Sequence, residues 1–273
     1  MAFSKKLISA QRKQGSLLCI GLDTDAALLP RHLGRSANAV LAFNRRIIDA
    51  TADLVCAYKL NLAFYETLGA EGWRVMEKTL EHIPHNIITI GDGKRGDIGN
   101  TSECYAKALF DELGFDAATV NPYMGYDSVE PFLQWSGRGV FLLALTSNPG
   151  SNDVQRLRLS GGFLYEHVVR SAVKWNTKKN IGLVVGATHP NELRRIRNLT
   201  PEMPILIPGV GKQGGDLKSA IRYGCTKRGD RAIINASRSI LYASRGKDFA
   251  QAARREAMRL RNEIEKYLEA FFK

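Results

Sequence analysis

The chain has 273 residues, of which 44% are hydrophobic and 24% charged, a composition that supplies a large core and excludes global disorder. Apolar runs reach ~6 residues against the ~20 of a membrane span, and the charged N-terminal segment lacks the apolar region of a secretory signal, so we expect a cytoplasmic protein with no membrane partner. The net charge of +12 comes from dispersed Lys and Arg without a nucleic-acid-binding motif, which predicts a solvated surface containing a local phosphate site and no nucleic-acid partner.

Short β-rich runs alternate with longer amphipathic segments along the whole chain. The eight runs predicted as strands are Leu17–Leu22, Leu54–Lys59, Ile87–Gly91, Ala117–Asn121, Val140–Thr146, Ile181–Gly186, Ile205–Pro208 and Ala232–Asn235. Helices are predicted over Asn38–Ala52, Thr101–Leu113, Gly162–Trp175, Leu217–Tyr223 and Phe249–Phe272. Eight such units without a linker predict one α/β domain over residues 1–273, a (β/α)₈ TIM barrel, with a doubly wound sheet as the rival fold.

Charged residues stand at the ends of the first three predicted strands, which is where such barrels place catalysis. Asp23 follows the first strand, Lys59 ends the second, and Asp92 and Lys94 follow the third. Residues two apart on a strand point the same way, so Asp92 and Lys94 can both face the barrel mouth. The alternative interpretation is an exposed cluster of ion pairs without a function.

The last two predicted strands run into segments typical of phosphate binding. A glycine-rich loop, 208–216, follows the seventh strand, and Ser237 and Arg238 follow the eighth. Glycines expose backbone N–H groups, and an arginine binds phosphate with two parallel hydrogen bonds. These barrels often hold phosphate in the loops after strands seven and eight, so the sequence predicts a phosphate site there.

Two other features of the sequence predict neither a cofactor nor a metal site. Gly209, Gly211 and Gly214 form a literal GxGxxG, but the dinucleotide fingerprint also needs an acid at the end of the next strand. Asp230 has roughly the right spacing and yet precedes that strand, so we expect no nicotinamide cofactor. The four cysteines are far apart and form no CxxC, so neither a zinc site nor a disulfide framework is predicted.

Residues 92–101, DGKRGDIGNT, resemble the D-x-K-x-x-D-I-x-x-T signature of the orotidine 5′-phosphate decarboxylase family. The similarity extends over nearly the whole chain, and its other members are Asp23, Lys59 and the segments 145–150, 184–188, 208–215 and 237–239. Length and spacing are most similar to the longer bacterial subfamily.

The resemblance implies decarboxylation of orotidine 5′-monophosphate to UMP, the last step of UMP biosynthesis, without cofactor or metal. Lys94 would deliver the proton to C6 of the pyrimidine, within an alternating charge array of Lys59, Asp92, Lys94 and Asp97. The resemblance also implies a homodimer with shared active sites, in which Asp97 and Thr101 would reach into the partner's site.

The remaining site residues follow from the same resemblance. Asp23 and Lys59 would hold ribose hydroxyls, and Ser147 would bond the pyrimidine. Phosphate would be bound by Gln213, Arg238 and the backbone N–H of Ser237, and Ile98 and Pro208 would line the apolar wall near the departing carboxylate.

Two rival functions stay open at this point. A Mg²⁺-dependent sugar-phosphate decarboxylase or aldolase of the same barrel superfamily has a similar motif, but it carries an acid where this chain has Lys59. From a different class, a non-enzymatic RNA-binding protein would explain the positive charge, but it would not explain why charges converge on strand ends.

Overall fold

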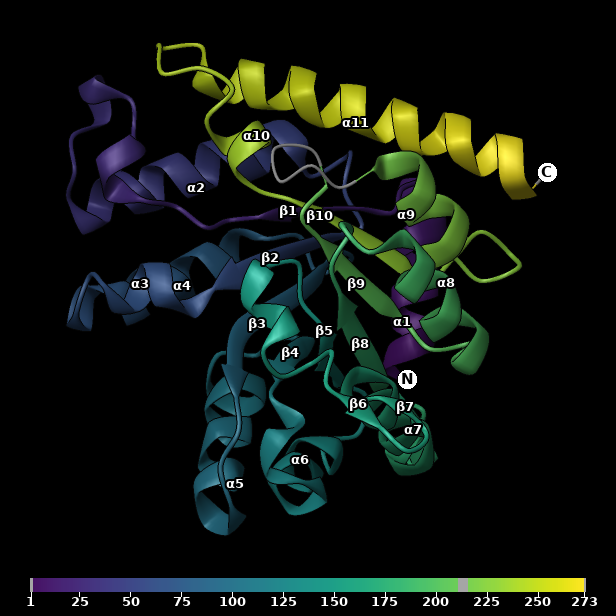
Figure 1. Cartoon of the computed structure of the whole chain (residues 1–273). Helices are drawn as coiled ribbons and strands as arrows, with labels where there is room; N and C mark the ends of the chain where they lie inside the picture. Colours follow the sequence, from purple (N-terminus) through teal and green to yellow (C-terminus); the bar gives the residue numbers. More distant parts are fainter. Residues whose placement is uncertain (1, 211–215, 273) are drawn as a thin grey trace.

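The structure is a computed structural model that describes residues 2–210 and 216–272 (Figure 1). Eight parallel strands close into a barrel in the order β1-β10-β9-β8-β5-β4-β3-β2. Each predicted strand overlaps one of them: β1 (Leu18–Gly21), β2 (Ala57–Asn61), β3 (Ile88–Arg95), β4 (Ala117–Val120), β5 (Gly139–Leu145), β8 (Ile181–Val185), β9 (Ile205–Pro208) and β10 (Ala232–Ala236). The (β/α)₈ prediction is confirmed, and the doubly wound alternative is wrong.

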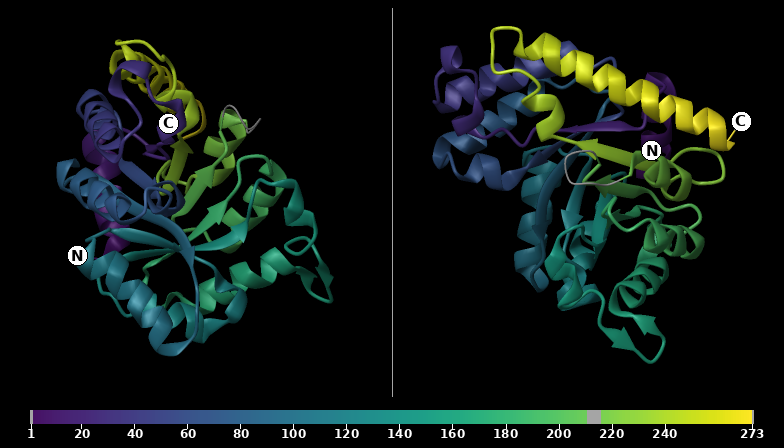
Figure 2. Two further views of the ribbon diagram at one scale, coloured as in Figure 1. Left: turned by 90° about the vertical axis from the view of Figure 1, so that its left-hand side faces the viewer. Right: turned by 45° about the horizontal axis from the view of Figure 1, so that its top comes forward.

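Helices form the outer layer around these strands (Figures 1 and 2). They are α2 (Ala37–Thr51), α3 (Leu62–Glu66), α4 (Ala70–His82), α5 (Gly99–Lys107), α6 (Tyr126–Leu133), α7 (Leu164–Trp175), α8 (Pro190–Leu199), α9 (Leu217–Gly224), α10 (Arg238–Leu241) and α11 (Phe249–Phe272). Short 3₁₀ turns cover Ala26–Leu28, Arg31–Leu33, Pro122–Met124, Pro149–Asn152 and Asn176–Lys178. None of the described helices is long and apolar enough to cross a membrane.

Two predicted helices have different limits in the structure. The segment predicted over Thr101–Leu113 is α5 followed by a π-helical turn over Ala108–Glu112. The helix predicted from Gly162 begins at Leu164, because Gly162 and Phe163 form strand β7, which pairs with β6 (Arg158–Leu159) in a small hairpin. Two-residue strands leave no periodic pattern in a sequence, so nothing indicated this hairpin.

Helix α1 (Phe3–Gln14) closes the N-terminal end of the barrel. Phe3, Leu7 and Ala10 belong to one buried cluster with side chains from inside the strands, among them Phe141 and Ile233. The rings of Phe3 and Phe141 meet edge to face at 5.8 Å. This helix therefore seals the end of the barrel opposite the predicted site.

We expect Phe3→Ala to lower the free energy of unfolding by about 3–5 kcal/mol, because it leaves a cavity in this buried cluster. Ser9→Ala, on the exposed face of the same helix, is the matched control and should change it by less than about 0.5 kcal/mol. Denaturant unfolding measures both. Equal stability of the two variants would show that α1 does not fill the barrel end.

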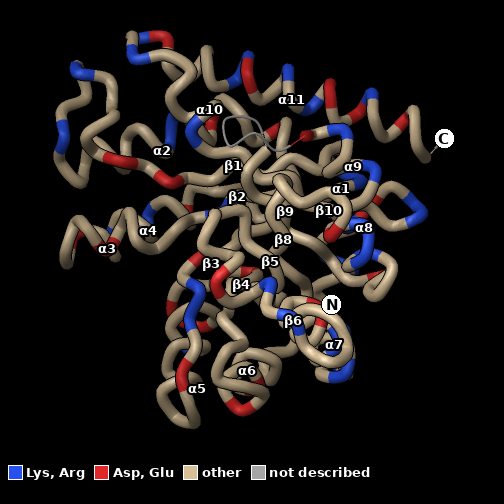
Figure 3. The backbone as a smooth tube through the Cα atoms, viewed as in Figure 1, with Lys and Arg blue, Asp and Glu red and all other residues tan. Residues whose placement is uncertain are grey.

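Basic and acidic residues are interspersed along α11 (Figure 3). On α11, Arg259 bonds both Glu256 and Glu263, and Arg254 bonds Asp53. The charges of these two arginines are thus neutralised locally. This pattern on α11 is typical of a solvated helix face.

Candidate active site

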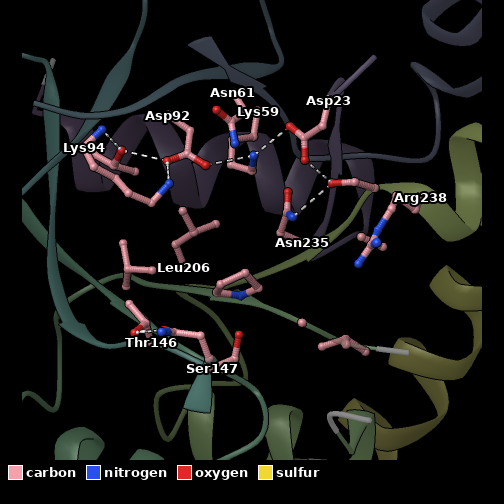
Figure 4. A pocket seen from close by; sticks show the side chains of 18 of the residues that line it. Asp23, Lys59, Asn61, Asp92, Lys94, Thr146, Ser147, Leu206, Asn235 and Arg238 are labelled. Carbon is pink, nitrogen blue, oxygen red and sulfur yellow. Dashed lines mark hydrogen bonds and ion pairs between the residues drawn. The ribbon is translucent and has the colours of Figure 1, made fainter. Parts of the chain in front are cut away.

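A pocket of about 370 Å³ opens at the C-terminal ends of the strands. Eight residues predicted from the sequence line it together: Asp23, Lys59, Asp92, Lys94, Ser147, Pro208, Ser237 and Arg238 (Figure 4). They come from the ends of six different strands and lie up to 215 positions apart in the chain. The closed barrel brings these ends to one mouth and so assembles the site.

Four charged side chains form a continuous alternating row along one side of the pocket. The Nζ of Lys59 lies 3.0 Å from Asp23 Oδ1 and 3.0 Å from Asp92 Oδ2. The Nζ of Lys94 lies 2.7 Å from the other Asp92 oxygen, Oδ1. Lys59 and Asp92 are buried, whereas the Lys94 side chain is 44% exposed. The row therefore ends in an ammonium group accessible from the cavity.

The row fixes the charge of its buried members. Burial alone would lower the pKa of Lys59, but Asp23 and Asp92 outweigh it and raise that pKa above its ordinary value. Burial likewise opposes ionisation of Asp92, and Lys59 and Lys94 outweigh it and hold the pKa of this carboxyl well below its usual range. Lys59 is thus a permanent cation and Asp92 a permanent anion at neutral pH.

An irregularity in β3 aims Asp92 and Lys94 into the pocket. Gly91 pairs with Ala118 and Arg95 with Val120, so β3 carries two more residues than β4 over this stretch. Within it the backbone of Lys94 is left-handed, at φ 47°. Such bulges redirect side chains beside functional sites.

Thr119, which the sequence reasoning missed, holds this irregular segment. Its hydroxyl accepts a hydrogen bond from the backbone N–H of Lys94 at 3.0 Å and donates one to Asp92 Oδ1 at 2.8 Å. The only signal in the sequence was a hydroxyl within an otherwise apolar strand. Because threonine is an ordinary strand residue, that signal is weak.

A second polar chain supports the Asp23 end of the row. Ser237 Oγ donates to Asp23 Oδ2 at 2.8 Å, and Asn235 Nδ2 lies 3.5 Å from Ser237 Oγ. Gly21 leaves room for this contact, since a Cβ there would lie 2.0 Å from Ser237 Oγ. Arg238 starts α10 beside them and lines the pocket.

The opposite side of the pocket is less charged. Leu143, Val184 and Leu206 form an apolar floor that continues into the barrel core, and Pro208 adjoins it. Thr146 and Ser147 lie across this floor from the charge row (Figure 4). The pocket therefore offers charge on one side, hydrogen bonds on the other and an apolar surface between them.

Three predicted residues do not reach the pocket of their own chain. Asp97 bonds the backbone N–H of Ile98, the Ile98 side chain is 55% exposed, and Thr101 is exposed on α5. Ile98 therefore does not line an apolar wall within one chain, and Asp97 is not part of the row there, because the turn after Arg95 carries both away from the mouth. Gln213 lies outside the described residues.

The donor set does not suit a divalent cation. Among the described residues, no group of three or more His, Cys, Asp and Glu side chains could hold a metal. The two carboxylates in the row, Asp23 and Asp92, both face the ammonium of Lys59. A cation between them would be repelled by that charge.

A closed parallel barrel with a buried lysine–aspartate row and an adjoining apolar pocket defines a small-molecule enzyme of the (β/α)₈ class. Residues 16–255 match the "Orotidine 5'-phosphate decarboxylase / HUMPS family", and the chain belongs to this family.

Individual proteins agree over nearly the full length. The orotidine 5′-phosphate decarboxylase of Dehalococcoides mccartyi is 52% identical over 275 residues, covering 99% of this chain and 100% of that protein. The one from Herpetosiphon aurantiacus is 51% identical over 93% of this chain and 95% of its own. The solved structure of Leishmania donovani OMP decarboxylase superposes with a TM-score of 0.86 at 38% identity and covers 98% of each chain.

Proposed function

We infer that this chain decarboxylates orotidine 5′-monophosphate to UMP in pyrimidine biosynthesis. The observation that carries the inference is the Asp23–Lys59–Asp92–Lys94 row at the barrel mouth of a chain that belongs to this family. The similarity of about 50% over nearly the full chain to proteins named orotidine 5′-phosphate decarboxylase disfavours the Mg²⁺-dependent alternative, and so does the ammonium of Lys59 between the two carboxylates.

Lys94 is the proposed proton donor. When the bond from C6 to the carboxylate breaks, carbon dioxide leaves and the electron pair stays on C6. The ammonium of Lys94 stabilises this developing charge and then transfers its proton to C6, and the resulting amine regains a proton from water. Its accessibility from the cavity, with Asp92 Oδ1 at 2.7 Å, supports this role.

Asp92 and Lys59 are proposed to act through charge. A permanent carboxylate at Asp92 faces the substrate carboxylate in the ground state, and this repulsion disappears when carbon dioxide leaves. Lys59 keeps Asp92 ionised although it is buried. Because these charges are already in place before the substrate binds, little reorganisation is needed during the reaction.

The other site residues are proposed to bind the substrate. Asp23 and Lys59 would hold the ribose hydroxyls, Ser147 the pyrimidine, and Pro208 the region of the departing carboxylate. Arg238, the backbone N–H of Ser237 and Gln213 would bind the phosphate. In support, all of these except Gln213 line the pocket described above.

We further propose a homodimer in which Asp97, Ile98 and Thr101 complete the partner's site. These residues do not line the pocket of their own chain. They follow Arg95, whose carbonyl accepts a hydrogen bond from the backbone N–H of Asn121, and the turn after Asn121 exposes two apolar side chains that a partner would cover: Tyr123 is 81% exposed and Met124 49%.

We also propose one domain over residues 1–273 and a cytoplasmic location. One closed barrel with a core shared by its helices supports the single domain. All four cysteines are free, which is typical of a reducing compartment.

The test is an ultraviolet assay of orotidine 5′-monophosphate with and without a chelator. We expect the same rate of turnover with and without the chelator, since no proposed step uses a metal. Activity lost on chelation and restored by Mg²⁺ would favour the sugar-phosphate enzyme. Salt-dependent binding of RNA without turnover would favour the RNA-binding protein.

A further inference from the structure

We propose that His189 is a positioning residue that sets the pyrimidine side of the pocket, by holding the carbonyl of Thr146, the residue before Ser147. The proposal rests on the function inferred above. His189 does not line the pocket and belongs to none of the segments discussed so far. It immediately precedes α8, where its backbone carbonyl accepts from the N–H of Leu193 while its side chain makes no capping hydrogen bond to that helix.

Both ring nitrogens of His189 have partners with fixed roles. Nε2 lies 3.1 Å from the carbonyl oxygen of Thr146, which can only accept a hydrogen bond. Nδ1 lies 2.9 Å from Nη2 of Arg156, which can only donate one. Nε2 must therefore carry the proton and Nδ1 the lone pair, and the two contacts together select one neutral tautomer.

Arg156 has a second partner, which binds the guanidinium nitrogen that does not contact His189. Its Nη1 donates to Glu192 Oε1 on α8 at 2.7 Å. Burial opposes ionisation of Glu192, but the hydrogen bond from Arg156 outweighs it and lowers the pKa of this carboxyl. Arg156 and Glu192 are thus a charged pair at neutral pH, and the imidazole joins this pair to the end of β5.

Gln155, the residue before Arg156, also holds Thr146. Gln155 Oε1 accepts from the backbone N–H of Thr146 at 2.7 Å, and Gln155 Nε2 donates to Thr146 Oγ1 at 2.8 Å. Gln155 therefore binds the peptide N–H that precedes the Thr146 Cα, and His189 binds the peptide C=O that follows it. The two contacts hold Thr146 on both sides of its Cα and so fix the direction in which the chain continues to Ser147.

Ser147 has little freedom to adjust by itself. Its backbone lies against Gly186, where an added Cβ would come within 2.8 Å of the Ser147 nitrogen. A shift of the Thr146 carbonyl therefore moves Ser147 relative to β8. The consequence falls on binding of the pyrimidine, because the Lys94 row lies on the other side of the pocket.

The arrangement works only with a neutral imidazole. A second proton on Nδ1 would remove the acceptor for Arg156 and place two cations face to face. Arg156, from the loop, and Glu192, from α8, are the charged groups that interact with His189 in the part of the chain described here.

The test compares His189→Ala with His189→Gln, whose amide can donate to Thr146 and accept from Arg156 but does not titrate. At pH 7.5 we expect His189→Ala to raise KM for orotidine 5′-monophosphate and the inhibition constant of UMP about tenfold, the effect of one lost hydrogen bond, with kcat within about twofold. His189→Gln should restore both constants to within about twofold of the native chain.

The split between KM and kcat, together with the rescue by His189→Gln, separates positioning from a merely structural role. A merely structural histidine would change the thermal midpoint of unfolding without changing KM or the inhibition constant of UMP.

Each outcome decides the proposal. A His189→Ala variant that binds like the native chain would overturn the role of His189 while leaving the decarboxylase intact. A native chain that turns over no orotidine 5′-monophosphate would refute the inferred function and this proposal with it.

Discussion

Lys94→Ala is expected to lower kcat by on the order of 10⁴-fold or more, the largest effect of any single change in this site. The substitution removes both the proton donor and the positive field at C6, and each contributes roughly 10²–10⁴-fold in comparable enzymes. Binding of UMP should weaken only a few-fold, because UMP has no reacting carboxylate. Single-turnover kinetics and calorimetric UMP binding measure the two effects.

A second variant, Lys94→Arg, distinguishes proton transfer from electrostatic stabilisation. Arginine keeps a positive charge near Asp92 but does not release a proton at neutral pH. If proton transfer is essential, Lys94→Arg should remain nearly as inactive as Lys94→Ala, whereas a purely electrostatic role would return much of the activity. A Lys94→Ala variant with a tenth or more of native kcat would exclude Lys94 as the donor.

The sequence allowed the barrel and most of its mouth to be predicted, because strands and charged strand ends follow local rules. Asp92 and Lys94 were expected to share a face as residues two apart on a regular strand. They do meet, at 2.7 Å, but through a bulged strand and a left-handed backbone at Lys94. The contact was foreseeable, whereas the geometry that produces it depends on pairing with β4.

Features that depend on distant partners were not predictable. Thr119 gains its role because the bulge brings Lys94 N–H and Asp92 to its hydroxyl, 25 and 27 positions away in the chain. His189 gains its role from Arg156 and Thr146, which a different loop supplies. Neither residue is a charged residue at a strand end, so neither belongs to the pattern that indicates the rest of the site in the sequence.

Asp97 is the predicted catalytic residue whose role one chain cannot fulfil, and mixing two inactive dimers tests it. Lys94→Ala disables the site of its own subunit, and Asp97→Ala should disable the partner's. A heterodimer of the two variants then has one doubly damaged site and one fully intact site. We expect each heterodimer to regain about half the activity of a native dimer.

Random re-pairing of equal amounts makes about half of all dimers heterodimers, so the mixture should recover about a quarter of native activity. Differently tagged chains and native mass spectrometry measure the extent of exchange. The matched control mixes Lys94→Ala with Asp92→Ala, two changes on the same side of one site. Every heterodimer in this control keeps one damaged residue in each site, so no activity should return.

The activities of the two mixtures together show in which subunit's site Asp97 acts. If activity returns only in the mixture that contains Asp97→Ala, this carboxylate acts across the subunit interface and an isolated monomer is nearly inactive. Recovery in neither mixture, with exchange demonstrated, means that Asp97 acts within its own chain. In that case the turn after Arg95, which now carries Asp97 away from the pocket, would have to fold inward when the substrate binds.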